Sequence, residues 1–94
     1  MLSTGIETIA KEMGVSVYPN PFKNYTNVSF TLEEEENVAL TVYSIIGDVV
    51  FHSEQTMSAG KQDLIINTGE FKSGVYIINL VAGDNVYTKK ISSY

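Results

Sequence analysis

Two prolines near the start of the chain constrain its fold more than any other feature. Pro19 and Pro21 stand in the stretch VYPNPF at residues 17–22, directly after an apolar segment. Proline has no backbone N–H and a fixed φ angle, so a strand can hold it only at a sheet edge or at the strand's own end. We therefore expect an edge strand that ends here and leaves the sheet in an extended or turn conformation.

From Val15 onward, apolar and polar residues alternate with a period of two, which is typical of strands. The expected strands cover residues 15–17, 28–32, 38–43, 49–56, 64–67, 75–81 and 86–92. The run at residues 75–81 is the most apolar, so we expect a central strand covered on both faces or nearly so. Seven strands at spacings of roughly 8–12 residues, with turn residues between them, predict an all-β antiparallel sandwich.

The length of 94 residues leaves room for one domain. Residues 1–14 differ from the rest, because Thr4 and Glu7 fit a capping box and Ile6 and Ile9 recur at helical spacing. A short amphipathic helix and a linker are equally compatible with this segment, since a helix of this length is marginal in water. We therefore predict a linker or short helix at 1–14, the end of an upstream region, and the sandwich at 15–94.

Composition argues against several classes of partner and site. The net charge is −5 and the chain has no arginine, whereas nucleic acid and anionic membranes call for a basic surface. The absence of cysteine excludes a disulfide scaffold, a thiolate zinc site and thiol chemistry. No apolar run approaches the roughly 18 residues of a membrane span, so we expect no membrane insertion. We expect no cofactor.

The sequence gives little support for catalysis or for a metal site. His52 is the single histidine, it lies in the middle of an expected strand, and no serine stands in a G-x-S-x-G context. We interpret it as an ordinary strand side chain. The four glutamates at 33–36 are expected at a solvated hairpin tip, because adjacent strand residues point to opposite faces and cannot converge on one cation.

Several short motifs then follow one another in a characteristic order. They are VYPNP at 17–21, the strand at 38–43 ahead of Gly47, Leu64, SGVYII at 73–78, Gly83, and TKKI at 88–91. This order resembles the C-terminal sorting domain of the type IX (Por) secretion system of Bacteroidetes, over about residues 15–94. The resemblance implies an immunoglobulin-like β-sandwich at the C-terminal end of a secreted enzyme or adhesin.

The resemblance also implies a function. The domain would act as a secretion and sorting signal without catalytic activity, recognised in the periplasm by the outer-membrane translocon and often removed by a sortase at the cell surface. The cargo, fused upstream, would reach the cell surface or the medium. Carried over position by position, the candidate recognition residues are Gly74, Tyr76, Gly83, Lys89, Lys90 and Ile91.

Two questions stay open at this point. Lys89 and Lys90 could bind a partner or could simply protect an exposed edge strand from aggregation. Deleting Lys89–Tyr94 is expected to block export while the rest folds, on the premise that the last strand adds less to the core than residues 75–81.

A second hypothesis is a carbohydrate-binding or adhesin-like sandwich that uses exposed tyrosines. The tyrosines of the chain are Tyr18, Tyr25, Tyr43, Tyr76, Tyr87 and Tyr94.

Overall fold

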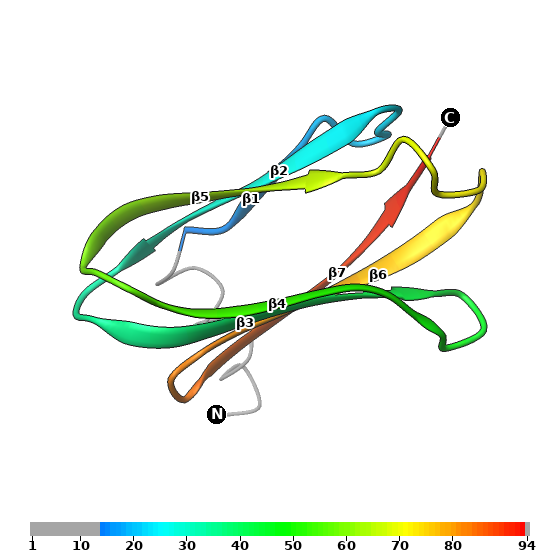
Figure 1. Ribbon diagram of the computed structural model, residues 1–94. Helices are drawn as coiled ribbons and strands as arrows, with labels where there is room; N and C mark the ends of the chain where they lie inside the picture. The colour runs from blue at the N-terminus through cyan, green and yellow to red at the C-terminus, as the bar shows by residue number, and fades with distance from the viewer. Residues whose placement is uncertain (1–13, 94) are drawn as a thin grey trace, which may run out of the picture.

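The computed structural model describes residues 14–93, which form a sandwich of two antiparallel sheets (Figure 1). Over this range the strands are β1 (Ser16–Tyr18), β2 (Tyr25–Leu32), β3 (Glu36–Ser44), β4 (Val49–Met57), β5 (Gly60–Asn67), β6 (Val75–Ala82) and β7 (Asn85–Ser92). One sheet has the order β1-β2-β5 and the other β4-β3-β6-β7. The predicted all-β sandwich is confirmed, whereas the helix or linker expected at 1–14 lies outside the described residues except for Gly14.

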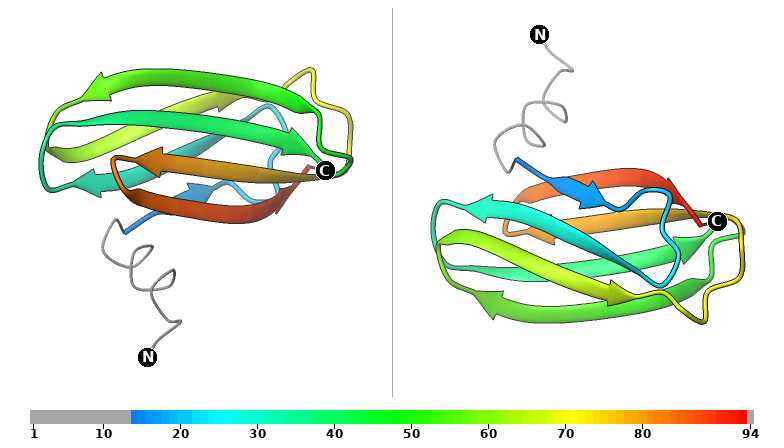
Figure 2. Two further views of the ribbon diagram at one scale, coloured as in Figure 1. Left: turned by 90° about the horizontal axis from the view of Figure 1, so that it is seen from below. Right: turned by 90° about the horizontal axis from the view of Figure 1, so that it is seen from above.

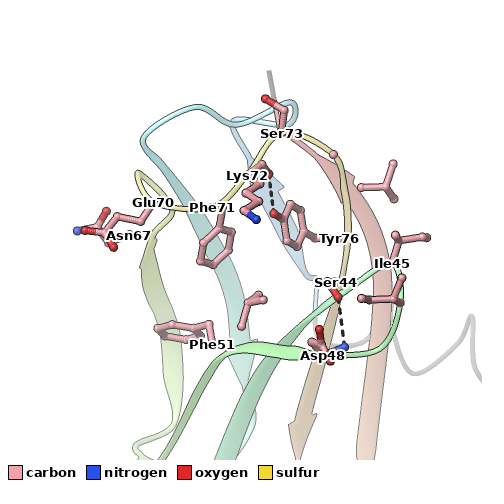
Figure 3. A pocket seen from close by; sticks show the side chains of 14 residues that line it. Ser44, Ile45, Asp48, Phe51, Asn67, Glu70, Phe71, Lys72, Ser73 and Tyr76 are labelled. Atoms are coloured by element: carbon pink, nitrogen blue, oxygen red, sulfur yellow. Dashed lines mark hydrogen bonds between the residues drawn. The ribbon is translucent and has the colours of Figure 1, made fainter.

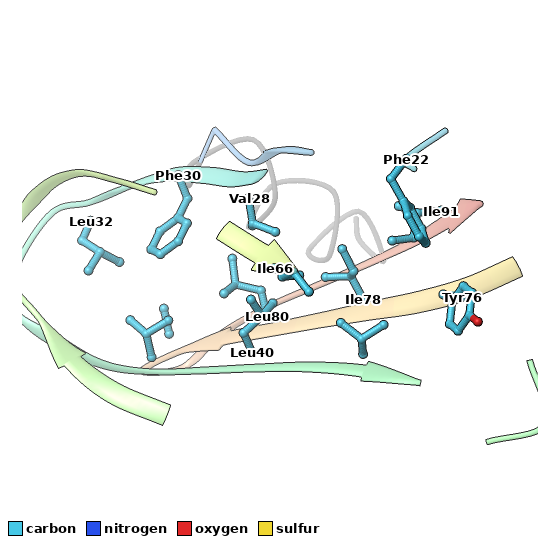
Figure 4. Packing of buried hydrophobic residues seen from close by; sticks show 13 residues of the cluster. Phe22, Val28, Phe30, Leu32, Leu40, Ile66, Tyr76, Ile78, Leu80 and Ile91 are labelled. Atoms are coloured by element: carbon cyan, nitrogen blue, oxygen red, sulfur yellow. The ribbon is translucent and has the colours of Figure 1, made fainter. Parts of the chain in front are cut away.

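The core lies between the two sheets and is built from alternate residues of the strands (Figure 4). Its buried members are Phe22, Val28, Phe30, Leu32, Val38, Leu40, Val42, Ile66, Tyr76, Ile78, Leu80, Ala82 and Ile91. β6 is central, between β3 and β7, as expected. Only one of its faces is buried, however, and the residues of the other face are half-exposed. Within residues 14–93, no second layer covers the outer face of this sheet, so β6 is more apolar than its burial requires.

Several strands extend beyond the boundaries expected from the sequence, among them β2, which begins at Tyr25 rather than at Val28. β5 begins at Gly60 rather than at Leu64, and β3 begins at Glu36, so the hairpin tip holds only three of the four glutamates. The added part of β5 pairs with β2, up to the pair Leu32–Gly60. These pairs are made by main-chain groups, which every residue type except proline can supply, so the polar side chains of this segment gave no sign of the pairing.

The two prolines lie where the N-terminal strand changes sheets. β1 pairs with β2 at the edge of the three-stranded sheet, which confirms the predicted edge strand. The Tyr18–Pro19 and Asn20–Pro21 peptide bonds are cis. After them, Phe22 forms a parallel bridge with Ser93, at the end of β7 in the other sheet. The views in Figure 2 show this first segment passing beside both sheets. The proline pair thus lies between an edge strand of one sheet and Phe22, which pairs at the edge of the other sheet.

Candidate functional site

The last residues of β7 lie against two loops that are distant in sequence. The N–H of Ser93 donates to the Gly74 carbonyl at 2.9 Å, and the N–H of Gly74 donates to the Ser93 hydroxyl, also at 2.9 Å. On the other side, the N–H of Ser92 donates to Asn20 Oδ1 at 3.2 Å, and the N–H of Phe22 donates to the Ser92 carbonyl at 2.9 Å. We call these five residues the C-terminal junction.

An aromatic cluster supports the C-terminal junction from inside. The Phe22 ring meets Phe71 edge-on at a centroid distance of 6.1 Å and Tyr76 at 5.8 Å, and Phe71 and Tyr76 are 5.1 Å apart. The Tyr76 hydroxyl donates to the Lys72 carbonyl at 2.5 Å. Tyr76 therefore fixes the loop that carries Gly74, and the cluster couples this loop to the segment that follows the prolines.

Of the candidate recognition residues, Gly74 and Tyr76 belong to this region, and both have a clear structural role. Gly74 has a φ of 150°, a conformation that residues with a side chain rarely adopt, and it starts the turn into β6. Tyr76 is buried in the core. In the Gly-x-Tyr motif, the glycine therefore permits the turn and the tyrosine holds the loop in place, which positions Gly74 to form hydrogen bonds with Ser93.

Gly83 lies at the opposite end of β6, away from the C-terminal junction. It forms a two-residue hairpin turn with Asp84, at a φ of 59°. A Cβ atom at this position would meet Glu36 Oε1. The structure thus gives Gly83 a conformational role and does not bring it together with Gly74.

The three candidates on β7 occupy different environments. Lys89 lies on the core-facing side, half-buried and paired with Ile78, while Lys90 is exposed on the outer face. The two lysines therefore do not form one basic patch. An inward-pointing charge on an edge strand is one way proteins block unwanted strand pairing. Ile91 is buried in the core, so the last strand does contribute to the core, although with fewer buried side chains than β6.

A groove of about 900 Å³ opens beside the C-terminal junction (Figure 3). One wall is the turn between β3 and β4, and the other is the loop between β5 and β6 that leads to Gly74. Phe51, Phe71 and Tyr76 line it, together with aliphatic residues of the turn. Our sequence reasoning missed this groove. The available signal was the aliphatic pairs on both sides of Gly47, in a turn where polar residues are usual.

The surroundings of His52 do not resemble an active site. Its Nδ1 is 2.9 Å from the Thr41 hydroxyl and its Nε2 is 3.8 Å from Glu54 Oε1. All three side chains project from the outer face of the β3–β4 pair, and none lines the groove. Across residues 14–93, no three histidine or acidic side chains gather in a way that could hold a metal ion.

Two of the six tyrosines share an exposed sheet face. Tyr18 pairs with Asn27, and Tyr25 lies two residues before Asn27, so both rings stand on the outer side of the three-stranded sheet. Tyr76 is in the core, and Tyr94 lies outside the described residues.

In the described part of the chain there is no helix long and apolar enough to cross a membrane.

Comparison with known proteins assigns the family. A sequence profile described as "Secretion system C-terminal sorting domain" matches residues 16–93, which is nearly the whole chain. The chain belongs to this family. The resemblance to the type IX sorting domain is thereby confirmed. Members of the family are tails of cargo proteins and serve as signals for type IX secretion, which implies export from the cell. The family is not a catalytic one.

The chain is also similar to one curated protein, named "Endo-acting ulvan lyase", of Formosa agariphila. The two are 36% identical over 78 residues, which make up 82% of this chain and 14% of that protein. The chain thus spans about one seventh of the relative's length.

Proposed function

We propose that this sorting domain acts only by protein–protein recognition and has no catalytic activity of its own. Residues 15–94 would form the recognised unit, and residues 1–14 would join it to a cargo domain. The translocon would bind the domain in the periplasm and carry the cargo across the outer membrane to the cell surface or the medium. A sortase could then remove the domain. The match to the sorting family over residues 16–93 carries this proposal.

The C-terminal junction supports a recognition surface that is formed only in the folded domain. Candidate residues Gly74 and Tyr76 are linked to the chain end by the hydrogen bonds of Ser93 and by the aromatic cluster. A translocon that binds this surface would therefore bind the folded domain and not the unfolded chain. The relative is named as an endo-acting ulvan lyase, so one protein that carries a similar domain is an enzyme, and a secreted enzyme is the kind of cargo we propose here.

Export of a fusion protein tests the proposal. A periplasmic reporter carrying this chain at its C-terminus is expressed in a bacterium that has the type IX system, and in a matched strain that lacks the translocon. We expect the reporter at the surface or in the medium of the first strain and in the periplasm of the second. Retention of an intact fusion in the periplasm of both strains would count against a sorting function.

A second candidate function is carbohydrate binding, which rests on the exposed Tyr18 and Tyr25 on one sheet face. Two neighbouring rings on a flat face could stack on sugar rings. A glycan array with the purified chain separates the two functions. A sorting domain is expected to bind no glycan, whereas a lectin-like domain would bind and would lose binding in a Tyr18→Ala, Tyr25→Ala double variant.

A further inference from the structure

The turn between β3 and β4 exposes an unusual amount of aliphatic surface. The exposed fractions are 67% for Ile45, 80% for Ile46, 58% for Val49 and 38% for Val50. Single exposed apolar residues are common, but a contiguous group marks an interaction site more often than chance placement does. Here Ile45, Ile46 and Val50 line one wall of the groove beside the C-terminal junction.

A β-bulge enlarges this apolar wall. Val42 pairs with Phe51 and Tyr43 with Val49, so Val50 is the extra residue in β4. In a regular strand, neighbouring side chains point to opposite faces, yet Val50 and Phe51 both line the groove. Bulges commonly redirect a side chain in this way and interrupt edge pairing. The bulge therefore favours a site that receives inserted side chains over one that adds a strand to β4.

The opposite wall and the rim complete the site. Phe71 and Tyr76 face the groove from the far side (Figure 3), and the volume of about 900 Å³ is sufficient for several side chains. Asp48, Glu70 and Lys72 contribute the charges of the lining, so carboxylates outnumber ammonium groups there. The turn is held by hydrogen bonds between Ser44 and the main chain of Asp48, which do not involve the Asp48 carboxylate.

We propose that this groove is where the secretion machinery holds the domain, by a protein segment that inserts a bulky apolar side chain flanked by lysine or arginine. The apolar group enters between the β3–β4 turn and Phe71, and basic groups beside it meet Asp48 on one wall and Glu70 on the other. The net charge of −5 on the chain favours a basic partner from a distance as well. This inference rests on the proposed sorting function. It adds the location of the contact and the chemistry of the partner.

The first test uses the reporter fusion with a single substitution in the groove. Ile46→Asp places a charge in the apolar wall, and Ile65→Asp is the matched control, because Ile65 is 69% exposed on β5 and does not line the groove. We expect export of the Ile46→Asp fusion to fall at least tenfold and export of the control to match the wild type. Thermal midpoints of the two purified variants that match the midpoint of the wild type verify that folding is intact.

The outcomes distinguish a failure of the sorting function from a failure of the groove proposal. If the wild-type fusion is not exported, the sorting function itself fails. If the wild type is exported and Ile46→Asp is exported equally well, the sorting function stands and the groove inference is overturned. A loss of export that is equal in Ile46→Asp and Ile65→Asp would also overturn it, because the effect would not be specific to the groove.

A second test examines the charge of the partner. The double variant Asp48→Lys, Glu70→Lys reverses the acidic groups of the rim. Its control, Glu33→Lys with Asp84→Lys, makes the same change in net charge at exposed positions outside the groove. We expect at least a fivefold greater loss of export for the rim variant. Equal export of the two double variants would overturn the basic partner.

A second copy of the chain is the competing occupant of the groove. The oligomeric state of the purified fusion distinguishes it from a partner in the secretion machinery. Light scattering of the purified fusion over a hundredfold range of concentration is expected to show a monomer for both the wild type and Ile46→Asp. A wild-type dimer that Ile46→Asp converts to a monomer would assign the groove to self-association and overturn the proposal.

Discussion

Replacing Phe22 tests whether the residue that follows the prolines belongs to the folded core. Its side chain is fully buried, and its ring contacts Phe71 and Tyr76 at centroid distances of 6.1 Å and 5.8 Å. Truncation of a buried phenylalanine to alanine costs about 3–5 kcal/mol, including the cavity that it leaves. About 0.5–1.5 kcal/mol of this loss comes from each aromatic contact. We therefore expect Phe22→Ala to lower the free energy of unfolding by about 3–5 kcal/mol.

This loss is large for a chain of 94 residues. Domains are stable by only about 5–15 kcal/mol, so Phe22→Ala removes a substantial part of the total. For a domain of this size, each kcal/mol lowers the thermal midpoint by roughly 4–8 °C, which gives a fall of at least about 12 °C. The N–H of residue 22 still donates to the Ser92 carbonyl in the variant, so the expected change reports the ring.

Urea unfolding of the full chain, followed by far-UV circular dichroism, measures the change. Phe22→Leu is the control, because it keeps most of the buried volume and loses the ring contacts, and we expect a loss of about 1–2 kcal/mol. Phe22→Ala with a loss below about 1 kcal/mol would refute the reasoning. The segment after the prolines would then be a linker and not a part of the core.

Three further outcomes are expected. Gly83→Ala should cost about 1–2 kcal/mol because of its positive φ, and adding Glu36→Ala should restore little of it, since the Glu36 side chain can move aside; a double-mutant cycle in urea measures both. Ser93→Ala should cost about 0.5–1.5 kcal/mol through the hydrogen bond from Gly74, and an unchanged thermal midpoint would contradict it. Burial raises the pKa of Tyr87 above 10.0, so the folded state favours the neutral phenol. The Tyr87 contribution to stability should be constant below about pH 10 and decrease above it, so the stability of Tyr87→Phe should fall less steeply above pH 10, and equal slopes in the two proteins would refute this.

The strands were predictable because burial on one face leaves a direct record in the sequence. Val28, Phe30 and Leu32 alternate with polar residues, and all three enter the core. The turn at Gly83 was predictable for a similar reason, since a two-residue hairpin needs a positive φ that glycine supplies. Features fixed by side chains within a few residues of one another were therefore accessible from the sequence.

The C-terminal junction was not accessible in the same way. The pairing of Phe22 with Ser93 and of Gly74 with Ser93 uses mainly backbone N–H and C=O groups, which are the same in every residue type except proline. Nothing in the local pattern around Ser92 names Asn20 as its partner. The groove was missed for another reason. Gly47 identified the turn correctly, but Val50 and Phe51 both line the groove at a bulge that the sequence does not encode by periodicity.

The structure also changes how the last strand can be studied. Deletion of residues 89–94 removes Ile91 from the core and takes from Phe22 and Gly74 their hydrogen-bond partners, so a loss of export after this deletion cannot be separated from a loss of folding. Lys90 is different, because it is exposed on the outer face of β7 and contributes little to the core. Substitution of Lys90 therefore tests recognition by this strand, whereas truncation tests recognition and folding together.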